Sequence, residues 1–259
     1  MIKARLRNFI ASDRKIQKLV ISCHYWLGRH WRWRRVMHLD HKAKFTAIYR
    51  HNLWNNEESR SGGGSTLKRT KRIRKGIVDL VQRLGVRSIL DAGCGDFNWM
   101  KTVDLAGVEY IGMDIVRAMI EENRERHGAS TRIFLEGDIL HDDLPRADVI
   151  LCREVLFHLS DADLLKALQN FKRSGATYLL TTHYPQGVNR DIPTGKCRVL
   201  NFTAAPFGFR APLEVITEDV DDHGLALWKL RDIDLRGLAT VLATRERCDV
   251  PPLNQVVTA

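Results

Sequence analysis

The strongest constraint on the fold is a repeated alternation of short apolar segments with longer polar stretches. The apolar segments do not alternate with polar residues, as is typical of strands buried on both faces, and most of them end in Asp or Cys. Helix-like stretches separate successive segments. This pattern predicts an α/β domain with a mostly parallel sheet. The expected strands are 86–91, 108–114, 131–138, 147–152 and 176–182.

The stretches around these strands carry recognisable helix and hairpin signals. Residues 160–175 begin at Ser160, a favourable N-cap, and stop at Gly175. The segments 213–219 and 225–230 flank a turn and predict a closing hairpin with an antiparallel edge. The fold is therefore expected to be a Rossmann-like, seven-stranded, mostly parallel sheet with a C-terminal antiparallel hairpin. Further helices are expected at 65–85, capped by Ser65, at 116–128, and in a short stretch through Trp99.

Charge divides the chain into a basic extension and a nearly neutral remainder. Residues 1–50 hold 13 Lys and Arg against two acids, a net charge of +11, whereas residues 51–259 carry −1. We expect a basic, Trp- and Arg-rich helical extension at 1–50, a catalytic domain at 51–240, and a tail at 241–259. A long irregular segment, 186–212, is expected to be functional.

The extension is amphipathic, and three roles remain open for it. Tryptophans alternate with arginines in "HYWLGRHWRWRRVMH", which suits an anionic membrane surface. Nucleic acid is a less favoured partner, and the apolar face could instead pack on the chain's own domain. The scattered cysteines and the lack of a long apolar run predict a cytoplasmic protein, which the basic N-terminus would associate with a membrane. The apolar face comprises Ile2, Leu6, Phe9, Ile16 and Val20.

The first predicted strand runs into the sequence "LDAGCGDFNW", which limits the ligand. Asp91 precedes Gly93 and Gly95, while Asn98 stands where a dinucleotide fingerprint has Gly or Ala. No Lys-Ser/Thr pair follows, so a phosphate-binding P-loop is also disfavoured. A carboxylate at this place predicts a cationic ligand portion, as in the ammonium and sulfonium of S-adenosylmethionine. A plain tight turn, with Asp91 capping the next helix, is the alternative.

These residues resemble the first motif of class I S-adenosylmethionine-dependent methyltransferases, with Phe97 in place of the third glycine. The resemblance covers residues 65–231. It implies that Asp114, next to Ile115, holds the ribose hydroxyls, and that Asp138 meets the adenine amino group with Ile139 beside the ring. For Asp114 alone, a solvated acid at a strand end is an equal alternative. The segment "ADVILCREVLFHLS", which contains Cys152, would face the methyl group and the acceptor.

A narrower resemblance links the chain to a bacterial branch of these enzymes that is associated with the O-methylation of sugars. It rests on "YRHNLWNNEESRSGGGST", "CGDFNWM", "CREVLFHLS" and "NRDIPTG". The glycine-rich loop that contains Ser61 and Gly63 is then expected to bind the carboxylate of the cofactor's methionine end. A flexible linker is the alternative for that loop.

Several side chains are candidates for the chemistry of methyl transfer. His158 is the first choice for general base and His183 the second; a helix-start histidine bonded to the backbone is the alternative for His158. Arg153 and Glu154 are expected to hold the acceptor or the sulfonium, or else to form a local ion pair. Polar residues of the long loop are expected to form hydrogen bonds with a polyhydroxylated acceptor; the alternative is that this loop is exposed and contacts only water. Its candidate residues are Asn189, Arg190 and Asp191.

The sequence favours transfer to a sugar, glycan or small-molecule hydroxyl. Cys-Arg-Glu follows the fourth strand, where enzymes that methylate amino groups of bases or glutamine carry an Asn-Pro-Pro-Tyr-type signature. No metal site is predicted. An RNA methyltransferase tethered by the basic extension, or a non-catalytic S-adenosylmethionine-binding scaffold, remain the alternatives.

Overall fold

The computed structural model describes residues 33–218 and 223–249, and it divides into two units, Met1–Leu53 and Trp54–Ala259. In the first unit, helix α3 (His41–Arg50) begins after Asp40, whose carboxylate accepts a hydrogen bond of 2.9 Å from the Ala43 amide. The amphipathic face predicted between Ile2 and Val20, and the start of the tryptophan-rich stretch, lie outside the described residues.

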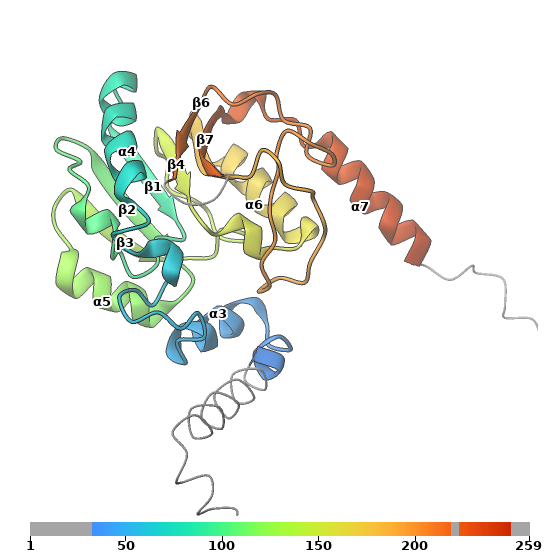
Figure 1. The fold of residues 1–259 in the computed structure, drawn as a ribbon, viewed down its shortest axis with the longest axis horizontal. Coiled ribbons are helices and arrows are strands. Elements are labelled where there is room, and N and C mark those ends of the chain that lie inside the picture. Colours follow the sequence, from blue (N-terminus) through green and yellow to red (C-terminus); the bar gives the residue numbers. More distant parts are fainter. Residues whose placement is uncertain (1–32, 219–222, 250–259) are drawn as a thin grey trace, which may run out of the picture. The chain divides into compact units, whose positions relative to one another are not determined.

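The second unit is built on a seven-stranded sheet with the order β3-β2-β1-β4-β5-β7-β6 (Figure 1). The first five strands pair in parallel, and β7 pairs antiparallel with both β5 and β6. The predicted Rossmann-like sheet with a C-terminal antiparallel hairpin is confirmed. The strands are β1 (Ser88–Ala92), β2 (Glu109–Asp114), β3 (Arg132–Glu136), β4 (Val149–Cys152), β5 (Tyr178–His183), β6 (Glu214–Thr217) and β7 (Gly224–Lys229).

Helices cover both faces of this sheet, as Figure 1 shows. Helices α4 (Lys71–Leu84) and α5 (Arg117–His127) supply buried side chains to one apolar cluster. Helix α6 (Asp161–Arg173) packs with α7 (Arg236–Asp249) and the long loop in a second cluster on the other face. Since both faces are covered, the central strand β4 is buried and apolar along its whole length, and the strands beside it carry polar residues mainly toward their ends.

The ends of two helices test the capping signals. At α6, the Ser160 hydroxyl accepts a hydrogen bond from the Asp163 amide, and Gly175 follows the helix with a φ of +75°. Both signals are confirmed. Helix α4, however, begins at Lys71, and Ser65 instead ends a short 3₁₀ turn (Gly63–Ser65).

Tertiary hydrogen bonds explain the late start of α4. The Ser65 carbonyl accepts from the Asn98 side chain, and the Leu67 amide donates to Glu58. Both backbone groups are therefore used before a helix could recruit them. Similarly, no α-helix runs through Trp99, and a 3₁₀ turn (Met100–Thr102) follows it. Helix α7 crosses residue 240, where the sequence pattern placed the end of the domain.

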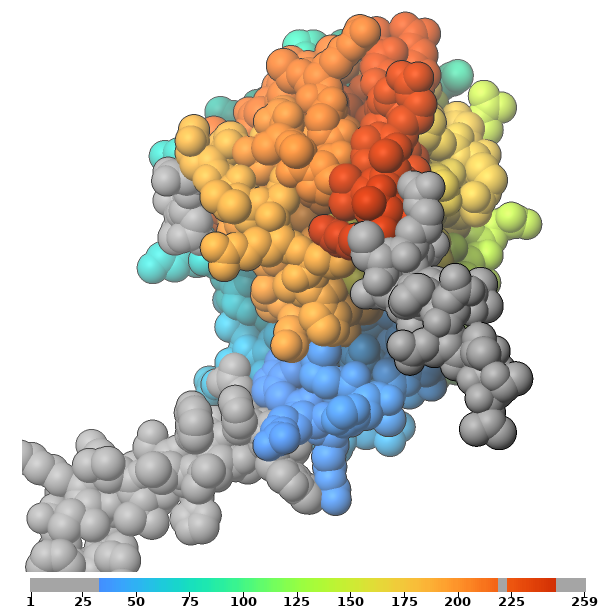
Figure 2. Space-filling view, turned by 90° about the vertical axis from the view of Figure 1, so that its right-hand side faces the viewer, coloured from blue at the N-terminus to red at the C-terminus, as the bar shows by residue number. Residues whose placement is uncertain are grey.

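The long segment between β5 and β6 has no regular secondary structure. In Figure 2 it forms a continuous yellow-to-orange surface beside α7, which is drawn in red. Its aromatic side chains are buried: Phe202 and Phe209 pack against Trp228 of β7, and Phe207 packs against these two phenylalanines. This segment is therefore a packed part of the domain.

Candidate active site

The loop after β1 is the tightest turn at the carboxyl edge of the sheet. Gly93 and Gly95 have φ angles of +92° and +59°. The amides of Gly93 and Cys94 both donate to the Met113 carbonyl, which ties the loop to β2. A Cβ on Gly95 would lie 2.2 Å from the Ser61 hydroxyl oxygen, so backbone conformation and space both require glycine there.

Phe97, which replaces the third glycine of the motif, keeps a glycine-like backbone. Its φ is +56°, which is uncommon for a bulky residue. Its buried ring packs against Tyr110 and Phe134, with ring centroids 5.1 Å apart in both cases. The aromatic packing therefore compensates for the strained backbone, and the loop retains its path without the third glycine.

Three carboxylates surround this glycine loop. Asp91, within β1, accepts a 2.6 Å hydrogen bond from the Tyr110 hydroxyl. Asp114, at the end of β2, accepts from the amides of Gly95 (3.1 Å) and Val116 (3.0 Å). Asp96 lies in the loop itself, half-buried. The two backbone donors fix the orientation of the Asp114 carboxylate at the strand end.

Burial and neighbouring negative charge raise the pKa of two of these carboxyls. Burial raises the pKa of Asp91 to about 7, opposed by the Tyr110 hydrogen bond and increased further by the charge of Asp114. Burial also raises the pKa of Asp114, against hydrogen bonds from Val116 and Gly95, and the charge of Asp96 adds to the increase. The loop is therefore a place of concentrated negative potential, which favours a cationic ligand and opposes a pyrophosphate.

Asp96 also anchors the glycine-rich loop at 61–65, a role that the sequence did not suggest. Its carboxylate accepts hydrogen bonds from the hydroxyls of Ser59 and Ser61 and from the Arg60 amide. The Asp96 amide in turn donates to the Ser61 hydroxyl over 2.9 Å. The loop that contains Ser61 and Gly63 is thus tied directly to the loop after β1, which argues against a free linker.

The residues predicted to hold the adenine lie just after β3. One oxygen of Asp138 accepts from the Leu140 amide, and the other lies 2.9 Å from Nδ1 of His141. Ile139 is buried, and Ile115, after β2, is half-buried. The two strand ends lie side by side, because Asp114 pairs with Glu136 in the parallel register. The adenine and ribose roles stay predictions.

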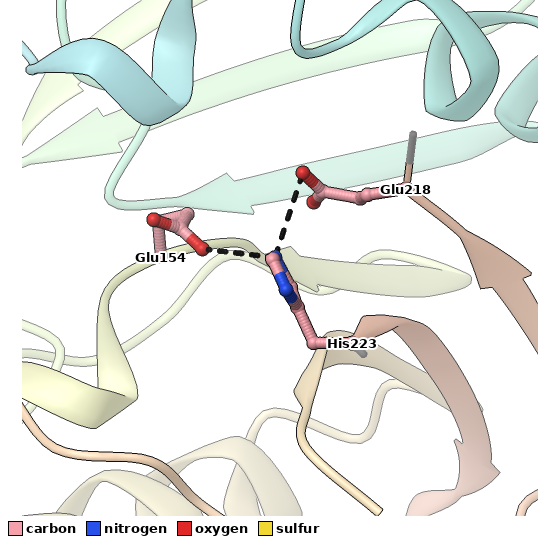
Figure 3. Close-up of side chains that lie close together, drawn as sticks. All are labelled: Glu154, Glu218 and His223. Atoms are coloured by element: carbon pink, nitrogen blue, oxygen red, sulfur yellow. Dashed lines mark ion pairs between the residues drawn. The ribbon is translucent and has the colours of Figure 1, made fainter. Parts of the chain in front are cut away.

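The residues after β4 form a cluster with the β6–β7 hairpin (Figure 3). Arg153 donates to both carboxylate oxygens of Glu218, over 3.0 and 2.8 Å. Nε2 of His223 lies 3.6 Å from Glu218 and 3.8 Å from Glu154. The local ion pair that was the alternative for Arg153 is thus present, with Glu218 as the partner.

The pKa values of the two carboxyls in this cluster are shifted in opposite directions. Burial raises the pKa of Glu154. Burial alone would also raise that of Glu218, but His223 and Arg153 hold the pKa of this carboxyl below its usual value. Glu154 reaches the glycine-rich loop as well, since a Cβ on Gly64 would lie 2.7 Å from its Oε2.

Cys152 differs from its neighbours after β4. Its side chain has no exposed surface and belongs to the apolar cluster under α6. Burial raises its pKa well above the usual value, so the thiol is neutral. Contact of Cys152 with the cofactor stays a prediction.

His158, the preferred general base, is held in a defined tautomer. Its Nδ1 lies 2.9 Å from the Lys196 carbonyl, which can only accept, so Nδ1 carries the proton. Its ring stacks on Trp54 with centroids 5.5 Å apart. Burial lowers its pKa to about 4, which leaves the imidazole neutral but makes it a weak base at pH 7.

His183 lies in a different environment, inside the domain. Its Nδ1 accepts from the Phe202 amide over 3.3 Å, and its ring contacts Phe202 and Trp228. Burial lowers its pKa. These contacts favour a structural role, and catalysis by His183 stays a prediction.

The candidate acceptor residues of the long loop are engaged in holding that loop. The Asn189 amide bonds to the backbone of Asn201 and Ala205. Asp191 accepts from the Asp161 amide and pairs with Arg245 of α7 over 2.8 Å. The Arg190 carbonyl accepts from Arg198. Contact of Asn189, Arg190 or Asp191 with an acceptor therefore stays a prediction.

Comparison with known proteins agrees with this geometry. Residues 89–175 match a family described as "Methyltransferase domain". The chain contains a class I S-adenosylmethionine-dependent methyltransferase domain. The matched region includes the glycine loop, the Asp114 and Asp138 strand ends, and the residues after β4. No curated protein matches the chain by sequence.

The solved structure of TnmH shares the fold of this domain, and two further solved structures are similar to parts of the chain. TnmH is 18% identical over 73% of this chain and 59% of its own, with a TM-score of 0.54. PigF with SAH is 16% identical over 60% of both chains, with a TM-score of 0.45. Magnesium protoporphyrin IX methyltransferase from Synechocystis PCC 6803 is 14% identical over 76% of this chain and 89% of its own, with a TM-score of 0.45. The chain thus spans less than two thirds of TnmH and PigF.

The donor set of the methyltransferase domain fits S-adenosylmethionine, the cofactor of this class. The buried carboxylates Asp91 and Asp114 match a cation and a pair of ribose hydroxyls, and no lysine or arginine of the glycine loop is placed for phosphate. Among residues 33–218 and 223–249, no helix has the length and apolar character needed to cross a membrane.

Proposed function

We propose that the protein transfers the methyl group of S-adenosylmethionine to a hydroxyl of a sugar, glycan or small molecule. The carrying observation is that Asp91, Asp96 and Asp114 lie together at the glycine loop, where burial and neighbouring negative charge raise the pKa of Asp91 and Asp114 and a cationic ligand would favour their ionised forms. Asp114, oriented by Gly95 and Val116, would accept hydrogen bonds from the ribose hydroxyls.

The glycine-rich loop would close the methionine end of the site. Ser61 and Asp96 bond to each other in both directions, so this loop is fixed relative to the loop after β1. The Ser65 amide already donates to the Gly62 carbonyl, so the amides of Gly63 and Gly64, at the start of the 3₁₀ turn, would be the donors for a carboxylate. Asp138 and Ile139 would receive the adenine.

A hydroxyl acceptor is supported by the side chains after β4. Bound S-adenosylmethionine would supply an electrophilic methyl group, which would pass from sulfur to the acceptor oxygen with S-adenosylhomocysteine as the neutral leaving group. Something must take the hydroxyl proton. Nε2 of His158 carries a lone pair in the tautomer that Lys196 imposes, and Glu154 offers a carboxylate with a raised pKa. Arg153 is fixed by Glu218 and would orient the acceptor.

The basic extension would act outside the chemistry. Its net charge of +11 over residues 1–50 suits an anionic membrane surface, which would keep a cytoplasmic enzyme close to glycan or lipid-linked acceptors. Nucleic acid is the weaker candidate partner, since the residues after β4 do not resemble those of base-methylating enzymes.

Methyl-labelled S-adenosylmethionine distinguishes these functions. The full chain is incubated with separate pools of sugars and glycans, small-molecule alcohols and phenols, and RNA, with Asp114→Ala as the matched control. We expect label in a hydroxyl-bearing product and stoichiometric S-adenosylhomocysteine. Label confined to RNA would favour the tethered RNA enzyme. Tight cofactor binding without transfer to any pool would favour a scaffold.

A further inference from the structure

The cluster of Glu154, Glu218 and His223 has an unusual feature, a buried imidazole without hydrogen bonds. The His223 side chain is 1% exposed, and neither of its ring nitrogens has a hydrogen-bond partner among the residues that the structure describes. Oε1 of Glu154 is likewise buried and accepts no hydrogen bond from them. Unpaired buried polar atoms are costly and rare, so a group absent from the protein chain is expected between them.

The spacing of the three side chains fits one small cation. Nε2 of His223 lies 3.6 Å from a Glu218 oxygen and 3.8 Å from a Glu154 oxygen, and the three ligand atoms lie within 4.8 Å of one another. These distances are too long for hydrogen bonds. Two ligands that each bind a metal at about 2.1 Å with an angle of about 120° are roughly 3.6 Å apart.

Three different parts of the chain converge to make this arrangement. Glu154 follows β4 and has a φ of +58°, a conformation that turns the backbone at this residue. Glu218 and His223 flank the turn between β6 and β7, where the Glu218 amide donates to the His223 carbonyl. In Figure 3 both carboxylates point at the same edge of the His223 ring. The Tyr184 ring stacks on the His223 ring, with centroids 4.6 Å apart.

The charges of the cluster leave room for a cation. Two carboxylates face one guanidinium, and Arg153 uses one lone pair on each Glu218 oxygen. The remaining lone pairs of Glu218, those of Glu154 and the imidazole nitrogen are the donors. Arg153 opposes a dication by its own charge, so we expect binding weaker than at a site with two unpaired carboxylates.

We propose that Glu154, Glu218 and His223 bind one divalent transition-metal ion of the Mn²⁺ or Zn²⁺ class. Two carboxylate oxygens and one imidazole nitrogen match the ligand preferences of these ions. Three protein ligands leave further coordination positions for water or another oxygen ligand, as is typical of sites that do more than stabilise a fold. The site lies at the carboxyl end of β4, beside the glycine-rich loop.

Manganese binding tests the proposal without cofactor or acceptor, so its failure is independent of the proposed function. The full-length protein is stripped with a chelator, dialysed, and titrated with Mn²⁺ while electron paramagnetic resonance reports the free ion. We expect one saturable site, displaced by Zn²⁺. His223→Gln and Glu154→Gln should each weaken Mn²⁺ binding at least tenfold, whereas His127→Gln, at the far end of α5, should bind like the wild type.

The shift of Tm on adding Mn²⁺ reports metal binding even in a variant whose own stability is lowered. Mn²⁺ should raise the Tm of the wild type and of His127→Gln, and it should leave the Tm of His223→Gln unchanged. Glu154→Gln is nearly isosteric and removes one charge, so it separates loss of a ligand from loss of packing. A wild type without saturable Mn²⁺ or Zn²⁺ binding would overturn the proposal. Equal affinity in the wild type and both cluster variants would overturn it too.

Discussion

The carboxyl of Asp91 makes the stability of the domain depend on pH in a direction unusual for an aspartate. Its pKa is about 7 in the folded chain, against 3.8 as the ordinary value, because it is fully buried beside Asp114. The folded state therefore holds a proton that the unfolded state has already released. Stability is lost as pH rises from about 4 to about 7, and the loss is complete above pH 7.

The size of this effect follows from the two pKa values. A difference of about three pKa units corresponds to roughly 4 kcal/mol in total at about 1.4 kcal/mol per unit. Between pH 5 and pH 8 this single group should remove about 2–3 kcal/mol from the free energy of unfolding. Asn cannot ionise, so Asp91→Asn should abolish this part of the pH dependence, whatever constant offset the buried amide adds.

Urea unfolding of the cofactor-free protein at pH 5, 6, 7 and 8 measures the effect. The stability of Asp91→Asn relative to wild type should increase steadily with pH and level off near pH 8. Asp79→Asn, at an exposed position of α4, is the control and should run parallel to the wild type. A constant difference between wild type and Asp91→Asn across this range would refute the assignment of a raised pKa to Asp91.

Three further predictions concern the base, the glycine-rich loop and the extension. His158→Ala should lower turnover by about 10²–10⁴-fold with cofactor affinity nearly unchanged, and an unaltered rate in a steady-state assay would exclude His158 as the base. Asp96→Asn should weaken cofactor binding and increase proteolytic cleavage near Ser61, because an amide cannot accept hydrogen bonds from both serines and the Arg60 amide at once. An unchanged cofactor affinity in calorimetry and an unchanged cleavage rate would contradict the anchoring role. Deleting residues 1–40 should preserve the affinity for S-adenosylmethionine but weaken binding to anionic vesicles in a sedimentation assay. The loss of binding free energy should be about 1 kcal/mol per basic residue near the surface, and less at high salt. If the deletion weakens RNA binding in gel shifts and leaves vesicle binding unchanged, the extension binds nucleic acid.

The sheet was predictable because strands buried on both faces and acids at strand ends leave a strong local signal. Asp91, Gly93, Gly95 and Asp114 come together in the structure because each belongs to an element that the pattern places at one edge. The start of α4 was not predictable, since Ser65 is diverted by Asn98, a partner 33 residues away.

The sequence did not reveal the roles of some site residues because their partners lie far away in the chain. His223 and Glu218 flank what reads as an ordinary turn, and their partners Glu154 and Arg153 lie 64 or more residues earlier in the chain. Only the antiparallel placement of β7 beside β5 brings that turn to the end of β4. Asp96 lies inside the recognised motif, but its partners belong to a segment that the sequence alone left as a possible linker.

Isothermal calorimetry with S-adenosylmethionine, its demethylated product and NADH tests the central claim most directly. Wild-type protein should bind S-adenosylmethionine and S-adenosylhomocysteine and should ignore NADH. Asp114→Ala should lose up to about 1.5–3 kcal/mol for each of two charge-assisted hydrogen bonds to the ribose. Tight binding of NADH with none of S-adenosylmethionine, or equal cofactor affinity in Asp114→Ala and wild type, would contradict the account of this site.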